Sequence, residues 1–271
     1  MSGQVPPLMA TKYALQGPEN APVVVLIHGL GLTRAMWDRT VPALSRTHRI
    51  LTYDLLGHGE TRHPGGVPTL SDLSDQLGSL MAQISVQKAA IIGFSLGGMV
   101  ARRFAQNHPD RTLALGILHS PHRRSPQAQA AVTARLVQAR TIGPAATVND
   151  ALARWFTDGF RQNNPEMMDL VRGWVLANDP ATYHLYYAIF AHAVDDVIAP
   201  TPPLTCPTFV ITGDQDQGSS PQMARAIAAD IPGAQIHILP GLRHMALMED
   251  PGQTNRLQQA FLARHLPPAA I

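Results

Sequence analysis

The sequence predicts an α/β protein with a doubly wound, mostly parallel β-sheet and a helical cap inserted after the strand that ends near Leu118. Two observations lead to this fold class. Short, continuously apolar runs alternate with helical patterns, which is typical of parallel sheets whose two faces are both covered by helices. Residues 121–203 then show helical periodicity and no strand pattern, which predicts an insertion of helices within one core.

Apolar runs mark the expected strands. Four precede the helical stretch and two follow it: Val23–Ile27, Ile50–Tyr53, Ala89–Ile92, Leu113–Leu118, Thr208–Thr212 and Gln235–Leu239. Ligand sites in doubly wound sheets lie beyond the carboxyl ends of the strands. Functional residues are therefore expected in the loops that directly follow these runs.

The domain organisation follows from the same pattern. Residues 1–120 and 204–271 are predicted to form the core, and residues 121–203 the helical cap. The helical pattern of the cap is interrupted at Gly143-Pro144, Asn164-Pro165 and Asp179-Pro180. An insertion at the carboxyl ends of the core strands would form a lid over the site. Extra helices packed on the side of the core are the alternative.

Composition excludes several functional classes. The 271 residues carry a formal net charge of only +2, so neither nucleic acid nor a membrane surface is an expected partner. The single cysteine, Cys206, offers no disulfide framework, which favours a cytoplasmic protein. The segment Met1–Leu8 lacks the features of a signal peptide, and no apolar run approaches the length of a membrane span. No metal-binding cluster or nucleotide-binding motif is evident, so we expect neither metal nor cofactor. The sequence does not indicate an oligomeric state.

Ser95 is the strongest candidate for a catalytic residue. It lies in Gly93-Phe94-Ser95-Leu96-Gly97, between an apolar run and a helical pattern. Strand, tight turn and helix are the context in which this pentapeptide forms a nucleophile elbow. Glycines two residues to either side leave room for the neighbouring backbone. The pattern therefore predicts a serine nucleophile.

A serine hydroxyl needs a base, and the base needs an orienting group. His244 follows the last expected strand, and Asp216 follows the strand before it, so the chain order is Ser, Asp, His. Asp214 is the other acid candidate, but its place beside Gly213 suits a turn-stabilising role better. We therefore predict Asp216 as the acid and His244 as the base.

The remaining histidines near strands are interpreted differently. His58, His119 and His237 are each adjacent to an expected strand and are typical of core or turn positions. The loop His119-Ser120-Pro121 holds no carboxylate, so the main rival location for the acid is empty.

Attack on an acyl carbon also requires donors for the developing oxyanion. The backbone N–H of Leu96 is one predicted donor, and that of Leu30, in the loop after the first long strand, is the other. Trp155 is a candidate for lining the substrate pocket under the cap, and ordinary packing within the cap is the alternative. Arg123 and Arg124 could bind a substrate carboxylate, but a solvated pair of arginines is the favoured interpretation.

The chain resembles the α/β-hydrolase superfamily over nearly its whole length. The matching pieces are the His28-Gly29 loop, the turn Asp54–Gly59, the elbow Gly93–Gly97, the acid loop Gly213–Asp216 and the histidine loop Gly241–Pro251. In that family the third residue after the glycine of the acid loop is usually catalytic, which implies Asp216. The family usually has Arg where this chain has Leu56, which bears on the geometry of that turn.

Within the superfamily the chain resembles 3-oxoadipate enol-lactonase-like proteins and carboxylesterases. Arg154–Phe160 and Asn178–Tyr183 look like segments of the enol-lactonase lid, whereas His119–Arg124 departs from the enol-lactonase pattern. The resemblance implies a serine hydrolase that cleaves a small-molecule carboxylic ester or lactone through an acyl-enzyme.

Other functions remain open from the sequence. A carbon–carbon hydrolase of ring-cleavage products uses the same three residues, but usually with a Gly-Pro-Gly run that His28–Leu32 lacks. A cofactor-free haloperoxidase or perhydrolase also shares them. A ligand receptor on the same fold, with slow and incidental turnover, is the alternative that is not an enzyme.

Overall fold

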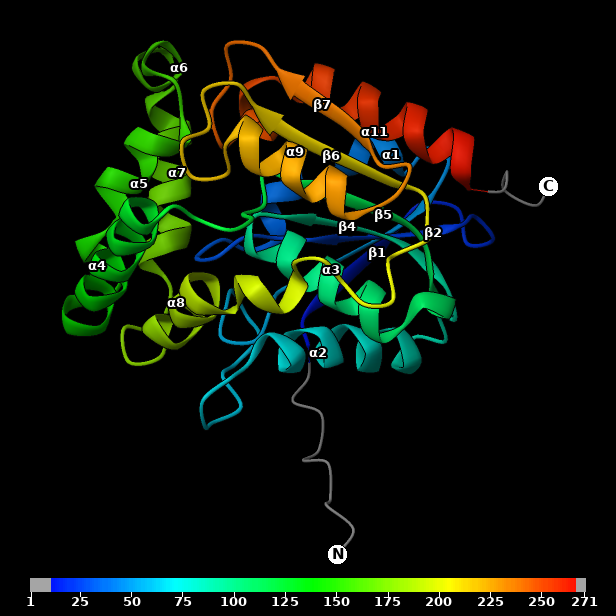
Figure 1. Ribbon diagram of the computed structural model, residues 1–271, viewed down its shortest axis with the longest axis horizontal. Helices are drawn as coiled ribbons and strands as arrows, with labels where there is room; N and C mark the ends of the chain where they lie inside the picture. The colour runs from blue at the N-terminus through cyan, green and yellow to red at the C-terminus, as the bar shows by residue number, and fades with distance from the viewer. Residues whose placement is uncertain (1–10, 267–271) are drawn as a thin grey trace, which may run out of the picture.

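A seven-stranded β-sheet forms the centre of the computed structural model, which describes residues 11–266 (Figure 1). Its strands lie in the order β1-β3-β2-β4-β5-β6-β7, and every neighbouring pair is parallel except β1 with β3. The strands are β1 (Tyr13–Gln16), β2 (Val23–Ile27), β3 (Arg49–Tyr53), β4 (Ala89–Phe94), β5 (Thr112–Leu118), β6 (Thr208–Gly213) and β7 (Gln235–Leu239). The predicted fold class is confirmed. The predicted lack of a signal peptide concerns residues outside the described range.

Strand β1 is the element that the sequence analysis does not predict. It is four residues long and pairs antiparallel with β3 at the edge of the sheet, from Tyr13 opposite Tyr53 to Gln16 opposite Ile50. Its side chains are exposed or half-buried, so no continuous apolar run marks it. An edge strand with one covered side leaves only a weak sequence signal.

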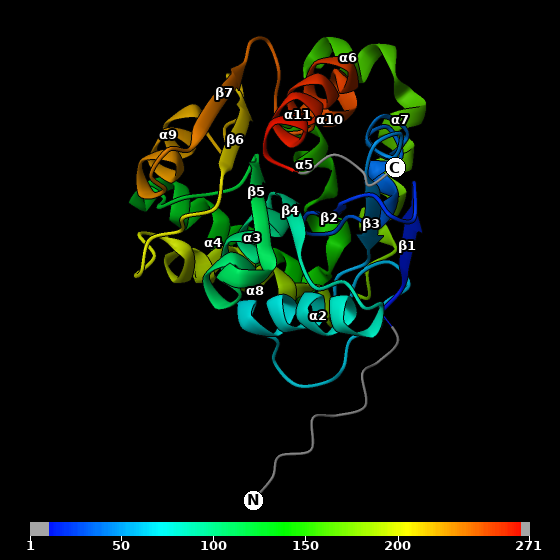
Figure 2. The same cartoon turned by 90° about the vertical axis from the view of Figure 1, so that its right-hand side faces the viewer.

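Helices cover both faces of the sheet (Figure 2). The α-helices outside residues 121–203 are α1 (Val41–Leu44), α2 (Leu70–Gln83), α3 (Leu96–Asn107), α9 (Pro221–Asp230), α10 (Ala246–Glu249) and α11 (Pro251–His265). Along β2, Val25 and Ile27 pack with residues of α2, α3 and α9, whereas Val24 and Leu26 pack with residues of α1 and α11. Alternate side chains of a strand point to opposite faces, so apolar residues at every position fill two hydrophobic layers.

The stretch 121–203 forms helices gathered beyond the carboxyl ends of the strands (Figure 1). They are α4 (Pro126–Ile142), α5 (Val148–Trp155), α6 (Asp158–Asn163), α7 (Pro165–Leu176) and α8 (Tyr183–His192). Proline begins α7, and Gly143, at φ 90°, ends α4. Tyr186 and Ile189 of α8 pack into the core cluster that contains α2 and α3. The division into core and lid stays a prediction. Within residues 11–266, no helix is both long and apolar enough to cross a membrane.

The close approach of β4 and α3 predicts that glycine is required at Gly93. A Cβ there would collide with the carbonyl of Gly97, which is backbone and cannot rotate away. We expect Gly93→Ala to lower the free energy of unfolding by about 1–3 kcal/mol or more. The matched control is Gly159→Ala in α6, where a Cβ meets nothing within 4 Å. That change should be neutral or gain up to about 1 kcal/mol. Urea unfolding measures both, and equal effects would contradict the packing argument.

Candidate active site

Ser95 forms the turn between β4 and α3 and has a strained backbone. Its φ of 56° and ψ of −114° place a non-glycine residue in a sparsely populated region. Its N–H donates to the carbonyl of Leu118 at 2.8 Å, and its carbonyl accepts from the hydroxyl of Ser120 at 2.9 Å. Leu118 is the last residue of β5 and Ser120 lies in the loop that follows, so the neighbouring strand and its loop hold the strained turn in place.

The loop after β2 lies against Ser95. A Cβ built on Gly29 would lie 2.9 Å from Cδ1 of Phe94 and 3.2 Å from Cβ of Ser95, so any larger residue would require these neighbours to shift. Leu30 lines the same pocket as Ser95, and Leu96 is the first residue of α3, fully buried directly after the serine. Neither the Leu30 nor the Leu96 N–H donates to a backbone carbonyl within residues 11–266. The N–H groups of Leu30 and Leu96 are therefore available to donate hydrogen bonds to another acceptor.

Asp216 and His244 are hydrogen-bonded to each other. Nδ1 of His244 lies 2.7 Å from Oδ2 of Asp216, and the Asp216 side chain is almost fully buried. The other carboxylate oxygen accepts from the backbone N–H groups of Gly218 (3.0 Å) and Ser219 (2.9 Å). Burial by itself would raise the pKa of Asp216, but the charge of His244 and the hydrogen bonds from His119 and His244 outweigh it and lower the pKa well below its usual range. The carboxylate is therefore ionised.

Asp214 has a different environment from Asp216. It is exposed, and its Oδ1 accepts a hydrogen bond from the N–H of Gly241 at 2.8 Å. This contact joins the loops after β6 and β7, as the turn-stabilising interpretation predicts.

His119 is a residue that sequence reasoning missed. Its Nδ1 lies 3.0 Å from the same Oδ2 of Asp216 that contacts His244, and its side chain is fully buried. The sequence analysis took His119 for an ordinary core or turn residue. Its position directly after β5, at the carboxyl edge of a central strand, is the signal that could have singled it out.

Five of the six residues predicted for the site line one pocket: Leu30, Ser95, Trp155, Asp216 and His244. Leu96 lies beneath Ser95 in α3, outside the lining. The Trp155 indole stacks on the His244 ring, with ring centres 6.1 Å apart, and its carbonyl accepts the N–H of Met245 at 2.9 Å. The end of α5 thus forms a wall of the pocket and holds the histidine loop.

Arginines from α4 and α5 line the pocket, but they are not the pair that the sequence analysis considered. Arg135 of α4 and Arg154 of α5 line it, and Nε of Arg135 donates to the Tyr187 hydroxyl at 3.2 Å. Within the described range neither arginine forms an ion pair with a carboxylate. Burial, and after it the charge of Arg135, lowers the pKa of Arg154. Two cations therefore face the pocket without an acidic partner.

Arg123 and Arg124 lie outside the pocket lining, and the expectation of a solvated pair is wrong for Arg124. Arg123 is exposed. Arg124 is buried, donates to the carbonyls of Phe190 (2.9 Å) and Ala191 (3.2 Å), and stacks over the Phe190 ring. The α8 carbonyls capture this side chain because α8 packs beside the loop after β5, a contact that sequence spacing does not show.

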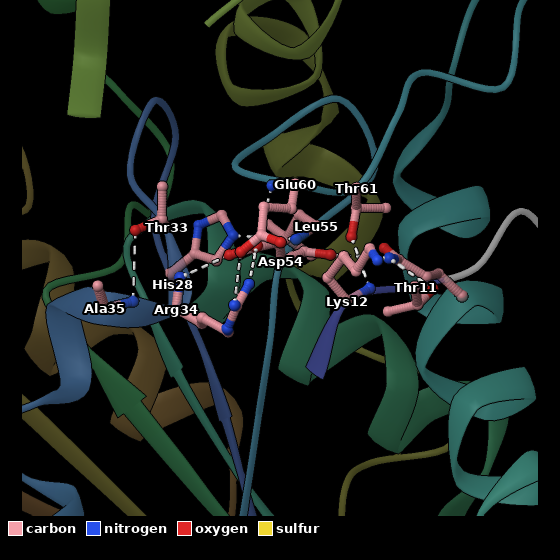
Figure 3. A network of polar contacts seen from close by, with 11 residues as sticks. Thr11, Lys12, His28, Thr33, Arg34, Ala35, Asp54, Leu55, Glu60 and Thr61 are labelled. Carbon is pink, nitrogen blue, oxygen red and sulfur yellow. Dashed lines mark hydrogen bonds and ion pairs between the residues drawn. The ribbon is translucent and has the colours of Figure 1, made fainter. Parts of the chain in front are cut away.

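A polar network fixes the loops after β2 and β3 (Figure 3). Nε2 of His28 accepts the Leu55 N–H at 2.9 Å, and Nδ1 lies 2.8 Å from the Gly29 carbonyl. Asp54 accepts the N–H of Arg34 (2.8 Å) and of Glu60 (3.1 Å), and it forms an ion pair with the Arg34 guanidinium. Arg34, from the 3₁₀ helix after β2, thus supplies a guanidinium at a turn that carries Leu56 where the family usually has arginine.

His119, Asp216 and His244 also have the composition of a metal site, with possible ligand atoms within 4.8 Å of one another. Their geometry fits hydrogen bonding better. Each imidazole places Nδ1 at 2.7–3.0 Å from the same carboxylate oxygen, which requires a proton between each pair of atoms. A shared zinc ion would need nitrogen and oxygen ligands each at about 2.0–2.2 Å from the metal.

Comparison with known proteins identifies the family of the chain: the family model of the alpha/beta hydrolases matches residues 24–257. The chain belongs to the alpha/beta hydrolase family. One curated relative of this alpha/beta hydrolase is 3-oxoadipate enol-lactonase 2 of Acinetobacter baylyi, 24% identical over 257 residues, with 94% of each chain covered. Another, from the same organism, is (E)-2-((N-methylformamido)methylene)succinate hydrolase, 24% identical and covering 93% of this chain and 94% of the relative.

Among solved structures, the chain is similar to the enol-lactonase from Burkholderia xenovorans LB400. The TM-score is 0.87 at 29% identity, over 93% of this chain and 96% of the other. The likeness therefore extends over the helices of residues 121–203 as well as the sheet.

The buried His28 predicts an acid-sensitive fold. Burial lowers its pKa from 6.5 to about 4, so below pH 6.5 the unfolded chain binds a proton that the folded chain does not. Stability therefore falls as the pH falls from 6.5 towards 4, and at pH 5 the His28 share is about 2 kcal/mol. We expect His28→Gln, whose amide oxygen can accept the Leu55 N–H, to lose about 2 kcal/mol less than the wild type between pH 7.5 and pH 5. Urea unfolding at both pH values is the measurement, and equal losses would contradict the prediction.

Proposed function

We propose that this alpha/beta hydrolase cleaves a carboxylic ester or lactone by nucleophilic catalysis, with Ser95 as the nucleophile, His244 as the base and Asp216 as the orienting acid. The observation that carries the proposal is the pocket itself. It combines a serine on a strained elbow, a buried carboxylate–imidazole pair and the Leu30 loop, whose amide donates to no backbone carbonyl of the described residues. The enol-lactonase likeness over most of the chain supports the same reaction class.

In the proposed mechanism, Ser95 Oγ attacks the carbonyl carbon while His244 Nε2 takes its proton. The Asp216 carboxylate accepts the Nδ1–H of His244. This hydrogen bond keeps the imidazole in the tautomer that leaves Nε2 unprotonated, and the carboxylate stabilises the imidazolium that forms. The N–H groups of Leu30 and Leu96 stabilise the developing oxyanion. His244 then protonates the leaving alkoxide, and water releases the acid by the same steps.

The cap arginines suggest the class of substrate. Arg135 and Arg154 are half-buried in the lining of the pocket, and of their donor atoms only Nε of Arg135 has a hydrogen-bond partner among the described residues. A guanidinium binds a carboxylate with paired hydrogen bonds, and partial burial strengthens that attraction. We therefore propose that the preferred ester or lactone carries an anionic group on the side that faces α4 and α5.

The nucleophile is tested by Ser95→Ala. We expect kcat/KM for p-nitrophenyl esters to fall by a factor on the order of 10⁵, because the variant has no atom that can form the acyl-enzyme. The fold should survive, since the serine side chain contributes little packing, and circular dichroism checks this. Labelling by a fluorophosphonate should also disappear. Turnover close to that of the wild type would refute the mechanism.

The same experiment separates the rival functions. A receptor would show one equivalent of product followed by stalling, whereas an esterase or lactonase turns over continuously. Labelling of Ser95 without hydrolysis of any ester or lactone would favour carbon–carbon cleavage. Bromination that depends on peroxide in a carboxylate buffer would instead reveal a perhydrolase.

The proposed anion preference is tested by Arg154→Gln. We expect kcat/KM for a p-nitrophenyl hemiester of a dicarboxylic acid to fall about tenfold or more, because a charge-assisted hydrogen bond is lost. The neutral ester of the same length should be hydrolysed at nearly the wild-type rate. Arg161→Gln is the control, because that arginine pairs with Asp158 on the exposed side of α6. Equal losses on both substrates would refute the anion subsite.

A further inference from the structure

The Asp216 carboxylate is contacted by two imidazoles, of which the proposed mechanism uses only one. Nδ1 of His244 and Nδ1 of His119 lie 2.7 Å and 3.0 Å from the same oxygen, Oδ2. The two rings stand edge to face, with centres 5.7 Å apart. With Gly218 and Ser219 on Oδ1, the carboxylate contacts four nitrogen donors. His119 is thus a buried titratable group, in contact with the proposed machinery, whose role is unassigned.

The backbone of His119 is held in a conformation that aims the ring at Asp216. Its φ is 49°, in the left-handed region that few non-glycine residues occupy, and its N–H donates to the Ile211 carbonyl at 2.7 Å. The ring packs against Phe94, the residue before the nucleophile, with centres 5.7 Å apart. A strained residue fixed between β5 and β6, beside the site, indicates a function rather than space filling.

The proton on His119 can be assigned from its surroundings. Burial lowers the pKa of His119, and the attraction of Asp216 offsets this only in part, so the ring is neutral near pH 7. A neutral imidazole carries one N–H. Because Nδ1 faces the carboxylate, we assign the proton to Nδ1, and Nε2 is then a bare nitrogen. Nε2 is buried and has no hydrogen-bond partner within residues 11–266, which suits an unprotonated atom better than an N–H.

We propose that His119 is a positioning residue, which holds the Asp216 carboxylate through its Nδ1–H and thereby weakens the pull of Asp216 on the proton of His244. This inference rests on the proposed function, in which His244 is the base. A carboxylate that shares its charge with a second donor stabilises the His244 imidazolium less than a carboxylate bound to His244 alone. His119 would therefore keep His244 a free base at lower pH, and would fix the plane of the carboxylate against rotation.

The charged and titratable groups near His244 come from several elements. Asp216 and His119 lie beside it in the loops after β6 and β5, and Arg135 of α4 and Arg154 of α5 line the same pocket. The neighbouring Arg243 is occupied elsewhere, with Asp158 and with the carbonyls of Ala153 and Phe156. A change at His119 therefore reaches His244 through Asp216 and through the edge-to-face contact of the two rings. Asparagine and leucine both remove that ring contact, and the arginines stay the same in every variant.

The test compares two variants of similar shape. His119→Asn keeps a donor close to the position of Nδ1 and tolerates a positive φ, whereas His119→Leu has nearly the shape of asparagine without the donor. The acid limb of the kcat/KM profile reports the protonation of the base in the free enzyme. In His119→Leu we expect the acid limb to shift to higher pH by about 0.5–1 unit and the plateau value of kcat/KM to fall about tenfold. Asparagine should restore the wild-type position of the limb.

A substrate-independent measurement separates this inference from the proposed function. The His244 ring is titrated by NMR in ¹⁵N-histidine protein without substrate, with His244→Gln to assign its signal. We expect a higher titration midpoint in His119→Leu than in the wild type or His119→Asn. Such a shift in a protein that hydrolyses no ester supports the role of His119 and refutes only the function. The inference is overturned if His119→Leu is active but neither the acid limb of its kcat/KM profile nor the titration midpoint of His244 moves upward. It is also overturned if His119→Asn behaves like His119→Leu. Thermal unfolding confirms that each variant is folded.

Discussion

The close approach of α3 to β2 and β4 is the constraint on which the rest of the candidate site depends. Gly93 faces the carbonyl of Gly97, and Gly97 in turn lies against the carbonyls of Ile27 and His28. No side chain fits between these backbones. Because the helix begins this close to the strands, Ser95 is forced into its strained turn, and the loop after β2 comes to lie beside it. A looser contact would separate the serine from the Leu30 amide, one of the two that the proposal assigns to the oxyanion.

The second constraint is a buried charge. Moving a carboxylate out of water is costly unless its oxygens are bonded to donors. Asp216 meets that need with two backbone N–H groups from its own loop and with two imidazoles from the loops after β5 and β7. The same contacts join the loops after β5, β6 and β7. Residues 121–203 are joined to this edge as well, since Arg243 donates to the Ala153 carbonyl of α5 and Asn178 donates to the carbonyl of Gly31 at 3.0 Å. Fold stability and site geometry therefore depend on the same bonds.

The sequence predicted much of this architecture because buried parallel strands are apolar at every position. All six expected runs are strands in the structure, with ends that differ by no more than two residues. Strand β1 was not predicted, because a strand at an exposed edge needs no continuous apolar run. The buried environment of Arg124 was not predicted for a different reason. The α8 carbonyls that capture it are 66 and 67 residues away in the chain, and local pattern carries no information on such a contact.

The sequence by itself determined which residue types follow which strands, and thereby named Ser95, Asp216 and His244 as candidates, since the carboxyl ends of parallel strands converge at one edge. It determined the mandatory glycines of the elbow for the same local reason. Only the tertiary structure decided that His119 shares the Asp216 carboxylate and that Arg135 and Arg154 enter the pocket. Those outcomes depend on the direction of side chains across packed elements. That direction depends on the left-handed backbone of His119 at φ 49° and on how α4 and α5 pack, and neither is encoded in the spacing of residues along the chain.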